Sequence, residues 1–397
     1  MSELLIDVGS TYFKIGSDEG TFQKFRNFEK SIFDDLMSKF GETISRYKKD
    51  EIFICSSANG GLSTLIIGLT ESFSTKYATN IAYNSGINII DTILYHNIDS
   101  AKTTGELLDV VIIAGGIDSI DLVFDERLFS YLEKLNYSNI VYVGSKKDAD
   151  FLKKNIDNLI VLKNIIDEDL KMDEDELKEY LTNLYQKDIV GKEDIKELYK
   201  ITSNQIFSTP YIVNQSLPFV DANFEVINPF IVVDIGGATT DIHYSKDLVR
   251  DNMLSSSEYD RLVFKKLGVY KSRESLIFTA KNNEFVYELL NYLNVTENIL
   301  EEYSNEATKI LMQLSIFLVL CKVSIHNPLY VTLKMELLKS IVFTGGITKV
   351  LEYEEIEKIV EFFYKKVLNT KNTTTIVLDK NYYIWTLGLK AIRSKSC

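Results

Sequence analysis

The stretch IVVDIGGATTD, residues 231–241, decides the fold of this 397-residue chain. A run of apolar β-branched residues, typical of a buried strand, ends at Asp234 and gives way to glycines and threonines. Glycine lets the backbone turn tightly and approach a ligand, and amide and hydroxyl groups at such a turn donate hydrogen bonds to phosphate. We therefore predict a hairpin that cradles a phosphate group. Its contacts are expected from Gly236, Gly237, Ala238, Thr239 and Thr240.

Two more glycine-bearing turns follow apolar runs near the two ends of the chain. Residues 7–11, DVGST, predict a second phosphate hairpin, with Lys14 on the outgoing strand placed to reach the same phosphates. Residues 344–347, TGGI, predict a turn against which a nucleoside lies flat. Each turn alone is also consistent with an ordinary strand connection, but three in series favour one nucleotide site. The contacts are expected from Gly9, Ser10, Thr11 and Lys14, and from Gly345, Gly346 and Ile347.

Three aspartates stand beside the two phosphate turns. Asp7 and Asp234 each open a turn, where a carboxylate can hold a hydrated Mg²⁺ through water, because this ion keeps most of its own water ligands. Asp241 opens the strand after the second turn and can complete the shell of metal or water. We assign these three residues to catalysis and the first two to magnesium. Gln215 is a candidate for orienting an attacking water.

The composition limits the class of protein. A formal net charge of −13 argues against nucleic acid as a partner, because phosphates along a strand need clustered Lys and Arg. Cys55, Cys321 and Cys397 stand far apart, so neither a disulfide framework nor a zinc site is encoded. These features, and an N-terminus without a signal-peptide pattern, indicate a cytoplasmic protein. The longest apolar stretch, residues 310–323, contains Gln313 and is too short to span a bilayer, which predicts a buried core helix.

Two other features of the sequence are of the kind found in ligand sites. His96, His243 and His326 stand alone, with no acid or cysteine at ligand spacing, which favours packing or surface positions over metal binding. The two glycines after the apolar run at residues 110–114 could approach a phosphate-bearing ligand, but a structural turn is the favoured interpretation.

The order of predicted elements indicates an α/β protein with an inserted unit. Residues 4–55 begin a first lobe with a strand, a helix and a strand. Residues 65–184 contain a βαβαβ series, hence a small parallel sheet, and residues 167–185 are predicted as a solvated amphipathic helix. Prolines between residues 208 and 229 mark a crossing between lobes. The predicted divisions are 1–64 and 201–228 for the first lobe and the crossing, 65–200 for the inserted unit, and 229–397 for the second lobe.

The ordered set of turns resembles the superfamily of actin, sugar kinases and heat-shock chaperones (ASKHA). In that superfamily two related ribonuclease H-like lobes close over ATP, with the phosphate hairpins facing each other. The resemblance implies a two-lobed actin-like ATPase fold with duplicated lobes and an inserted small α/β unit. It also implies ATP and Mg²⁺ as cofactors. It does not fix the task, because the same framework serves kinases, filaments, chaperones and activators.

A narrower resemblance is carried by collinear segments between the turns. They are residues 56–62, 110–118, 143–149, 209–210, 234–243, 261–270 (RLVFKKLGVY) and 382–389 (YYIWTLGL). These segments look like the glutamate mutase accessory family called GlmL or MutL. That family is encoded beside adenosylcobalamin-dependent carbon-skeleton mutases and aminomutases and is associated with ATP-dependent chaperone or reactivating activity. It shares a name, but none of these motifs, with the DNA mismatch repair protein.

The resemblance implies an ATP-binding accessory protein, with the subunits of a cobalamin-dependent mutase as partners and hydrolysis used for conformational work. A small-molecule kinase and a filament-forming actin-like ATPase are the alternatives. Asn59, in place of a smaller residue, and residues 117–120, in place of a more glycine-rich turn, depart from the family pattern. Neither nucleic acid nor a membrane is expected as a partner, and association into a homo-oligomer stays open.

Overall fold

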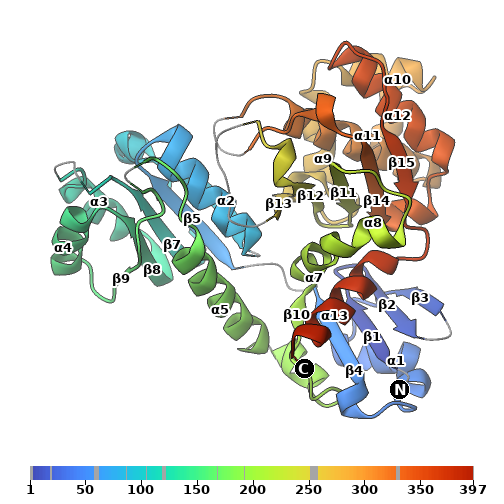
Figure 1. Ribbon diagram of the computed structural model, residues 1–397, viewed down its shortest axis with the longest axis horizontal. Helices are drawn as coiled ribbons and strands as arrows, with labels where there is room; N and C mark the ends of the chain where they lie inside the picture. Colours follow the sequence, from blue (N-terminus) through green and yellow to red (C-terminus); the bar gives the residue numbers. More distant parts are fainter. Residues whose placement is uncertain are drawn as a thin grey trace.

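The fold is built around three β-sheets. The computed structural model describes residues 3–17, 20–57, 62–85, 87–103, 105–118, 122–167, 169–191, 193–250, 258–327 and 331–396. Within these ranges the strands form three five-stranded sheets, two of them one above the other and the third set apart (Figure 1). The departures from the family pattern at Asn59, Ser119 and Ile120, and the cysteine Cys397, lie outside the described residues.

The first lobe is a mixed sheet with its first strand at the centre. β1 is buried along its whole length and pairs antiparallel with β2 and parallel with β4. β3 extends the antiparallel side, and β10, which follows the inserted unit in sequence, extends the parallel side. The strands in spatial order are β10 (Phe207–Ser208), β4 (Ile52–Ser56), β1 (Leu4–Val8), β2 (Tyr12–Ser17) and β3 (Gly20–Phe25). Two helices of this lobe that pack together are α1 (Ile32–Ile44) and α6 (Glu193–Leu198).

The second lobe repeats this sheet strand for strand. β11 pairs antiparallel with β12 and parallel with β14, and β13 and β15 extend the two sides. The common topology of the two sheets confirms the two-lobed actin-like fold with duplicated ribonuclease H-like lobes. The strands in spatial order are β13 (Tyr259–Phe264), β12 (Thr240–Ser245), β11 (Phe230–Ile235), β14 (Ser340–Gly345) and β15 (Thr375–Leu378). Its main helices are α9 (Arg273–Lys281), α10 (Val286–Tyr292), α11 (Asn305–Ser324) and α12 (Tyr353–Lys366).

Helix α11 is a core element of the second lobe. Among the described residues it is the one helix that is long and apolar enough, by length and composition, to cross a membrane. Its most apolar window is 72% buried inside the fold, and the helix packs against α9, α12 and β11. The buried core helix expected around residues 310–323 is therefore present.

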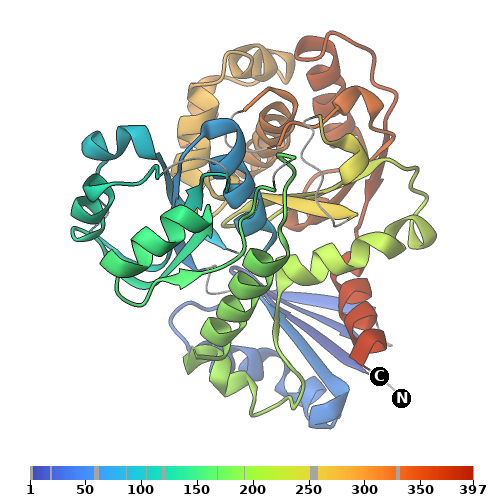
Figure 2. The same cartoon turned by 60° about the vertical axis from the view of Figure 1, so that its left-hand side comes forward.

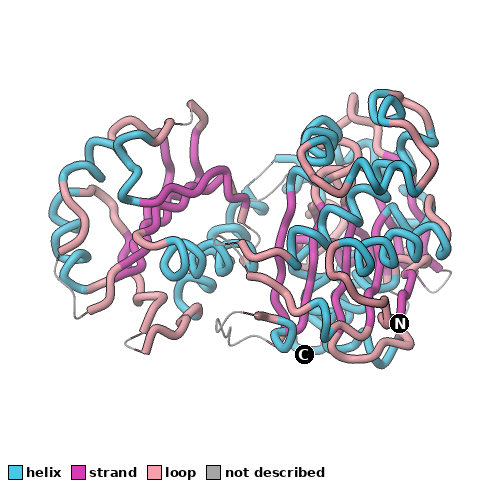
Figure 3. The backbone as a smooth tube through the Cα atoms, turned by 90° about the horizontal axis from the view of Figure 1, so that it is seen from above, coloured by secondary structure: helices cyan, strands magenta, loops and turns pink. Residues whose placement is uncertain are grey.

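The inserted unit is a parallel sheet with helices on both faces. Its strand order, second-first-third-fourth-fifth, is that of a doubly wound sheet. One face is covered by α2 and α5 and the other by α3 and α4, which lie farthest from the lobes (Figures 1 and 2). Figure 3 shows the unit beside both lobes. Its strands in spatial order are β6 (Asn88–Leu94), β5 (Ser63–Gly68), β7 (Leu107–Gly115), β8 (Asn136–Gly144) and β9 (Ile160–Val161). Its helices are α2 (Lys76–Asn84), α3 (Glu126–Leu132), α4 (Lys146–Asn155) and α5 (Asp175–Gly191).

The acidic segment before α5 corrects one expectation. The sequence predicts a single helix over residues 167–185, but α5 begins only after a turn. The Asp167 carboxylate accepts hydrogen bonds from the N–H groups of Asp169 and Lys171, which holds that turn. Leu170 lies in it with a φ of 63° and is 45% exposed, so it is not part of a helical apolar stripe.

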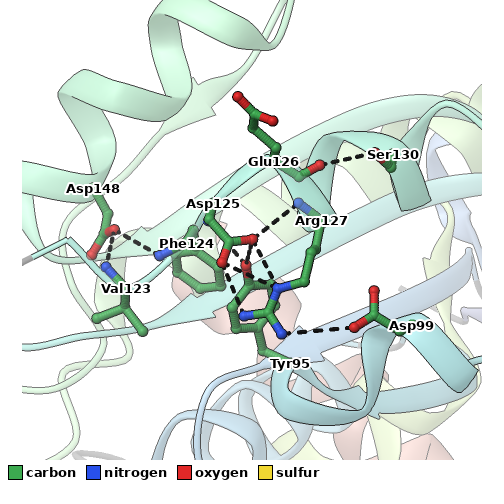
Figure 4. A network of polar contacts seen from close by, with 9 residues as sticks. All are labelled: Tyr95, Asp99, Val123, Phe124, Asp125, Glu126, Arg127, Ser130 and Asp148. Carbon is green, nitrogen blue, oxygen red and sulfur yellow. Dashed lines mark hydrogen bonds and ion pairs between the residues drawn. The ribbon is translucent and has the colours of Figure 1, made fainter.

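A polar network ties together the outer face of the inserted unit (Figure 4). The Asp125 carboxylate caps α3 by accepting from the Arg127 N–H at 2.9 Å, and it also accepts from the Tyr95 hydroxyl at 2.7 Å. The Arg127 guanidinium bonds to the same carboxylate and holds the pKa of Asp125 well below its ordinary range. Asp148 of α4 accepts from two backbone N–H groups of the loop before α3. These bonds join α4 to the loop before α3, and the start of α3 to Tyr95, the residue that follows β6.

Two helices cross between the lobes. α7 (Thr209–Ser216) follows β10, α13 (Tyr383–Ser396) ends the described chain, and the two pack against each other (Figure 1). Their apolar residues share a core cluster with the central strands of both lobe sheets. The close approach depends on Gly388 of α13, where an added Cβ would lie 1.9 Å from the carbonyl oxygen of Ile212 in α7.

We expect Gly388→Ala to destabilise the protein. The added methyl would meet backbone atoms of α7, and strain of this kind costs about 1–3 kcal/mol, against about 1 kcal/mol that alanine gains over glycine inside a helix. Urea unfolding followed by the fluorescence of Trp385, the only tryptophan of the chain, measures the change. Gly41→Ala in α1 is the control, because its added Cβ would make an ordinary 3.4 Å contact with Met37. Equal stability of the two variants would contradict the role of Gly388.

Candidate functional site

A cavity of about 810 Å³ lies between the two lobes. Parts of all three glycine-bearing turns line it, so the fold brings together segments that are far apart in sequence. The predicted site residues among its lining are Asp7, Gly9, Ser10, Thr11, Lys14, Asp234, Gly236, Gly237, Ala238, Thr239, Asp241, Gly345 and Gly346.

Two predicted site residues lie elsewhere. Successive side chains of a strand face opposite sides, and Thr240 turns away from the cavity that Thr239 and Asp241 line. The Thr240 hydroxyl is fully buried and donates to the carbonyl of Leu267 at 2.9 Å. Ile347 is also fully buried, in the main core cluster. The structure therefore corrects the expectation that the Thr240 hydroxyl lies at the cavity, and the Ile347 side chain is not part of the cavity lining.

The two phosphate turns have matching backbone hydrogen bonds. In each turn a glycine N–H donates to the carbonyl three residues later, Gly9 to Tyr12 and Gly236 to Thr239, both at 2.9 Å. The turns also meet across the lobes, because a Cβ added at Gly237 would lie 2.7 Å from the side chain of Thr11. The space between the turns therefore depends on glycine at this position.

Asp7 and Lys14 stand opposite each other on β1 and β2 and form an ion pair of 3.0 Å in the cavity wall. The Asp7 carboxylate is 1% exposed, and its other oxygen accepts a hydrogen bond from the Thr209 hydroxyl at 2.6 Å. Burial by itself lowers the pKa of Lys14, but the carboxylates of Asp7 and Asp234 raise it above its ordinary value. Lys14 is therefore a permanent positive charge at the cavity.

Asp234 lies across the cavity in a region rich in carboxylates. Removal from water raises its pKa to about 6, and the nearby Lys14 opposes the shift. The carboxylates of Asp241 and Asp7 add to it. Among the described residues no group of three or more His, Cys, Asp or Glu side chains could hold a metal ion directly. Repulsion among the carboxylates favours positive charge beside them.

Among the described residues, one carboxylate oxygen of Asp241 accepts a hydrogen bond and the other does not. Its Oδ2 accepts from the Thr239 hydroxyl at 2.9 Å, while its Oδ1 is buried and has no hydrogen-bond partner among the described residues. The nearest cation is the Arg261 guanidinium, with Nε 3.9 Å from Oδ1. Desolvation raises the pKa of Asp241, and Arg261 opposes this.

A family model described as MutL protein matches residues 3–314, more than half of the chain. The chain belongs to the MutL family. The curated relative Protein MutL of Clostridium tetanomorphum is 25% identical over 269 residues. This alignment covers 62% of the present MutL-family chain and 58% of the relative, so the chain spans less than two thirds of the relative's length.

Solved structures similar to this MutL-family chain share little sequence with it. Ethanolamine utilization protein EutJ from Carboxydothermus hydrogenoformans is 10% identical, with a TM-score of 0.29 over 98% of this chain and 89% of that chain. The activator of the 2-hydroxyisocaproyl-CoA dehydratase from Clostridium difficile, with bound ADPNP, is 11% identical, with a TM-score of 0.30 over 100% and 97% of the two chains. The fold assignment rests on the topology that the two lobe sheets share.

Two residues that contact Asp7 in this MutL-family chain are not revealed by the glycine motifs. Thr209 donates to the carboxylate, and the Cys55 thiol lies 3.6 Å from the same oxygen. Cys55 stands opposite Asp7 on β4, and β10, which leads to Thr209, lies beside β4. A strand prediction for residues 207–208 would have placed Thr209 here, because the carboxyl ends of parallel strands meet at one edge. Burial raises the pKa of Cys55 well above its ordinary value, so the thiol is neutral.

The second lobe supplies further cavity-lining residues that lie outside the three glycine-bearing turns. They include Tyr270, Lys271, Arg273, Glu274, Ser275, Tyr303, Thr308 and Met312. The Arg273 guanidinium lies over the Tyr303 ring at 4.7 Å. Tyr270 contacts Phe25 of the first lobe, with ring centroids 5.9 Å apart, so aromatic side chains bridge the lobes beside the cavity. Gln215, the candidate for orienting water, lies in α7 and is not part of the cavity lining.

We expect Asp234→Asn to stabilise the nucleotide-free protein at neutral pH. The folded state raises the pKa of Asp234 from 3.8 to about 6, so between these values it binds the proton more tightly than the unfolded chain does. This contribution to stability is complete below a pH of about 4 and is lost as the pH rises through about 6. Melting temperatures measured from about pH 4 to about pH 8 should show that the variant is more stable than the unmodified chain, by a difference that grows with pH. Asp247→Asn removes an exposed carboxylate of the same lobe and should show no such trend; a pH-independent advantage of Asp234→Asn would contradict the assignment.

Proposed function

We propose that this MutL-family chain binds Mg-ATP between its lobes and serves as an accessory protein, a chaperone or reactivating factor, for an adenosylcobalamin-dependent mutase. The observation that supports nucleotide binding is the pair of matching turns that meet across the cavity, each preceded by an aspartate. Membership of the MutL family supports the accessory task.

The phosphate side of the cavity fits a polyphosphate. Backbone N–H groups and hydroxyls from both turns can donate to phosphate oxygens, and Lys14 adds a charge-assisted hydrogen bond. The ion pair with Asp7 fixes the direction of Lys14, and Thr209 in turn fixes Asp7. A side chain at Gly237 would occupy the space between the turns. These residues would therefore hold the phosphates without rearrangement of their own partners.

The cation side fits a hydrated magnesium ion. Asp234 and Asp241 line the cavity and provide acceptors for its water ligands, and Asp7 closes the set. Bound Mg-ATP would supply the γ-phosphoryl group and the charge that offsets carboxylate repulsion. The raised pKa of Asp234 supports this, because it reflects negative charge and burial that a cation would offset.

The lobe crossing would turn phosphate binding into a change of shape. Thr11 and Gly237 belong to different lobes, so phosphate contacts made by both turns hold the lobes together. α7 and α13 cross between the lobes, and a change in their angle opens or closes the cavity. Loss of the γ-phosphate weakens the closed arrangement, which a bound mutase can sense.

Replacement of Lys14 by glutamine is expected to weaken the binding of Mg-ATP and Mg-ADP at least tenfold, about 1.4 kcal/mol, because the charge that meets the phosphates is lost. Titration calorimetry measures the affinity, and Trp385 fluorescence reports folding. Lys30→Gln, which changes an exposed lysine of the same lobe, is the matched control and should bind like the unmodified chain. Unchanged affinity in Lys14→Gln and in the Asp7→Ala and Asp234→Ala variants would show that the site is assigned wrongly.

ATP turnover is expected to depend on a mutase. Turnover by the full chain is measured with and without the adenosylcobalamin-dependent mutase encoded nearest to this gene, loaded with inactivated cobalamin, and release of the cobalamin is followed by absorbance. Stimulated turnover and release, both lost in Lys14→Gln, support the proposal. Turnover that needs an added metabolite would instead indicate a kinase, and nucleotide-dependent light scattering would indicate a filament.

A further inference from the structure

The inserted unit belongs to the first lobe by sequence but rests on the second lobe. The chain leaves the first lobe after β4 and returns to it at α6. Within the unit, α2 packs against β13, the edge strand of the second lobe. Ala78 and Ile81 of α2 share a core cluster with Tyr244 and Leu262 of that lobe. The unit is therefore continuous with the first lobe in sequence and packed against the second lobe in space.

Polar contacts fasten the end of α2 to two adjacent residues of β13. The Asn84 side chain donates to the Asp260 carboxylate at 2.9 Å and accepts from the Arg261 N–H at 2.6 Å. The Arg261 guanidinium donates through Nη2 to the Tyr83 carbonyl at 2.6 Å. This carbonyl lies in the last turn of α2, where carbonyl groups lack helical partners and the helix dipole favours a cation.

The same guanidinium reaches toward the cavity at its other side. Its Nε lies 3.9 Å from Oδ1 of Asp241, a cavity-lining residue. Both atoms are buried, and neither has a hydrogen-bond partner among the described residues. Arg261 and Asp241 are 3% and 5% exposed. One buried side chain thus spans the distance between the cavity wall and the inserted unit.

We propose that Arg261 is a positioning residue that transmits the state of the cavity to the inserted unit. The inference rests on the proposed function, because the state that it transmits is occupancy by a magnesium nucleotide. Asp241 can direct its free oxygen either to Arg261 or to the cavity. When Asp241 turns to Arg261, a hydrogen bond of about 2.9 Å replaces the present separation and draws the guanidinium toward the cavity. When Asp241 turns to the cavity, the guanidinium is released.

The rigid guanidinium transmits this movement to the end of α2. Because the group is planar, a displacement of Nε carries Nη2 with it and pulls or releases the Tyr83 carbonyl. α2 shares its core with strands of the inserted sheet, and the network around Asp125 ties the outer helices to that sheet. A shift at the end of α2 is therefore a shift of the unit as a whole.

Hydrogen exchange of the full chain, with and without Mg-ADPNP, tests this inference. In the unmodified chain the nucleotide is expected to change the exchange of amides in α2 and β13 severalfold. Arg261→Lys keeps the charge but cannot span both partners, so it should bind the nucleotide within about threefold of the normal affinity and lose the response in α2. Asn84→Ala weakens the same interface without touching the link to Asp241, so its α2 should exchange faster but still respond.

The outcomes separate coupling from simple support. A response of α2 in Arg261→Lys equal to that of the unmodified chain overturns the inference, as does an unmodified chain that binds Mg-ADPNP with no change in α2. Equal behaviour of Arg261→Lys and Asn84→Ala would show that Arg261 only supports the interface. If titration calorimetry detects no nucleotide binding by the unmodified chain, the proposed function fails, and this inference fails with it.

Discussion

The contact between α7 and α13 is the constraint on which the rest of the structure depends. Gly388 brings the two helix backbones together at Ile212, and the central strands of both lobe sheets pack against this pair. Each central strand ends in a turn, and the crossing places the two turns opposite each other. Neither lobe alone forms the cavity, so the geometry of the site is set by a contact that lies outside its lining.

The charges around the cavity do not all favour the stability of the fold. Lys14 has Asp7 as its partner, but Asp234 remains among carboxylates and partly out of water, which raises its pKa. Asp241 keeps a buried oxygen that has no hydrogen-bond partner in the part of the chain that the structure describes. Groups of this kind destabilise a fold unless something else compensates them, and functional sites are where such strain is commonly found. The two carboxylates with the least favourable surroundings, Asp234 and Asp241, are thus among the residues expected beside the cation.

Much of the site could be predicted from the sequence because its parts are local. An apolar run that ends in aspartate and glycine defines a strand and its turn within about ten residues. The orientation of the next strand is less local, because a one-residue shift exchanges its two faces. This is why Thr239 lines the cavity and Thr240 does not. The start of α5 could not be predicted for a related reason. The Asp167 carboxylate accepts hydrogen bonds from backbone N–H groups and holds a turn that the spacing of apolar residues does not indicate.

The remaining site residues depend on tertiary pairing. Thr209 reaches Asp7 because β10 lies beside β4, although the inserted unit separates these strands in the sequence. Arg261 lies in a segment that the family resemblance includes. Only the packing of α2 on β13 places its side chain between the Tyr83 carbonyl and the Asp241 carboxylate. Neither relation is encoded in the spacing of residues along the chain.

The inserted unit turns the molecule into a closed linkage. Its backbone joins the first lobe on both sides, α2 joins it to the second lobe, and α7 and α13 join the two lobes directly. Three units that are each joined to the other two move less freely relative to one another than two units joined by a hinge. Any widening of the cavity must therefore deform one of these joints. The most compliant joint sets how far the lobes separate, and so the size of the molecule that can enter or leave between them.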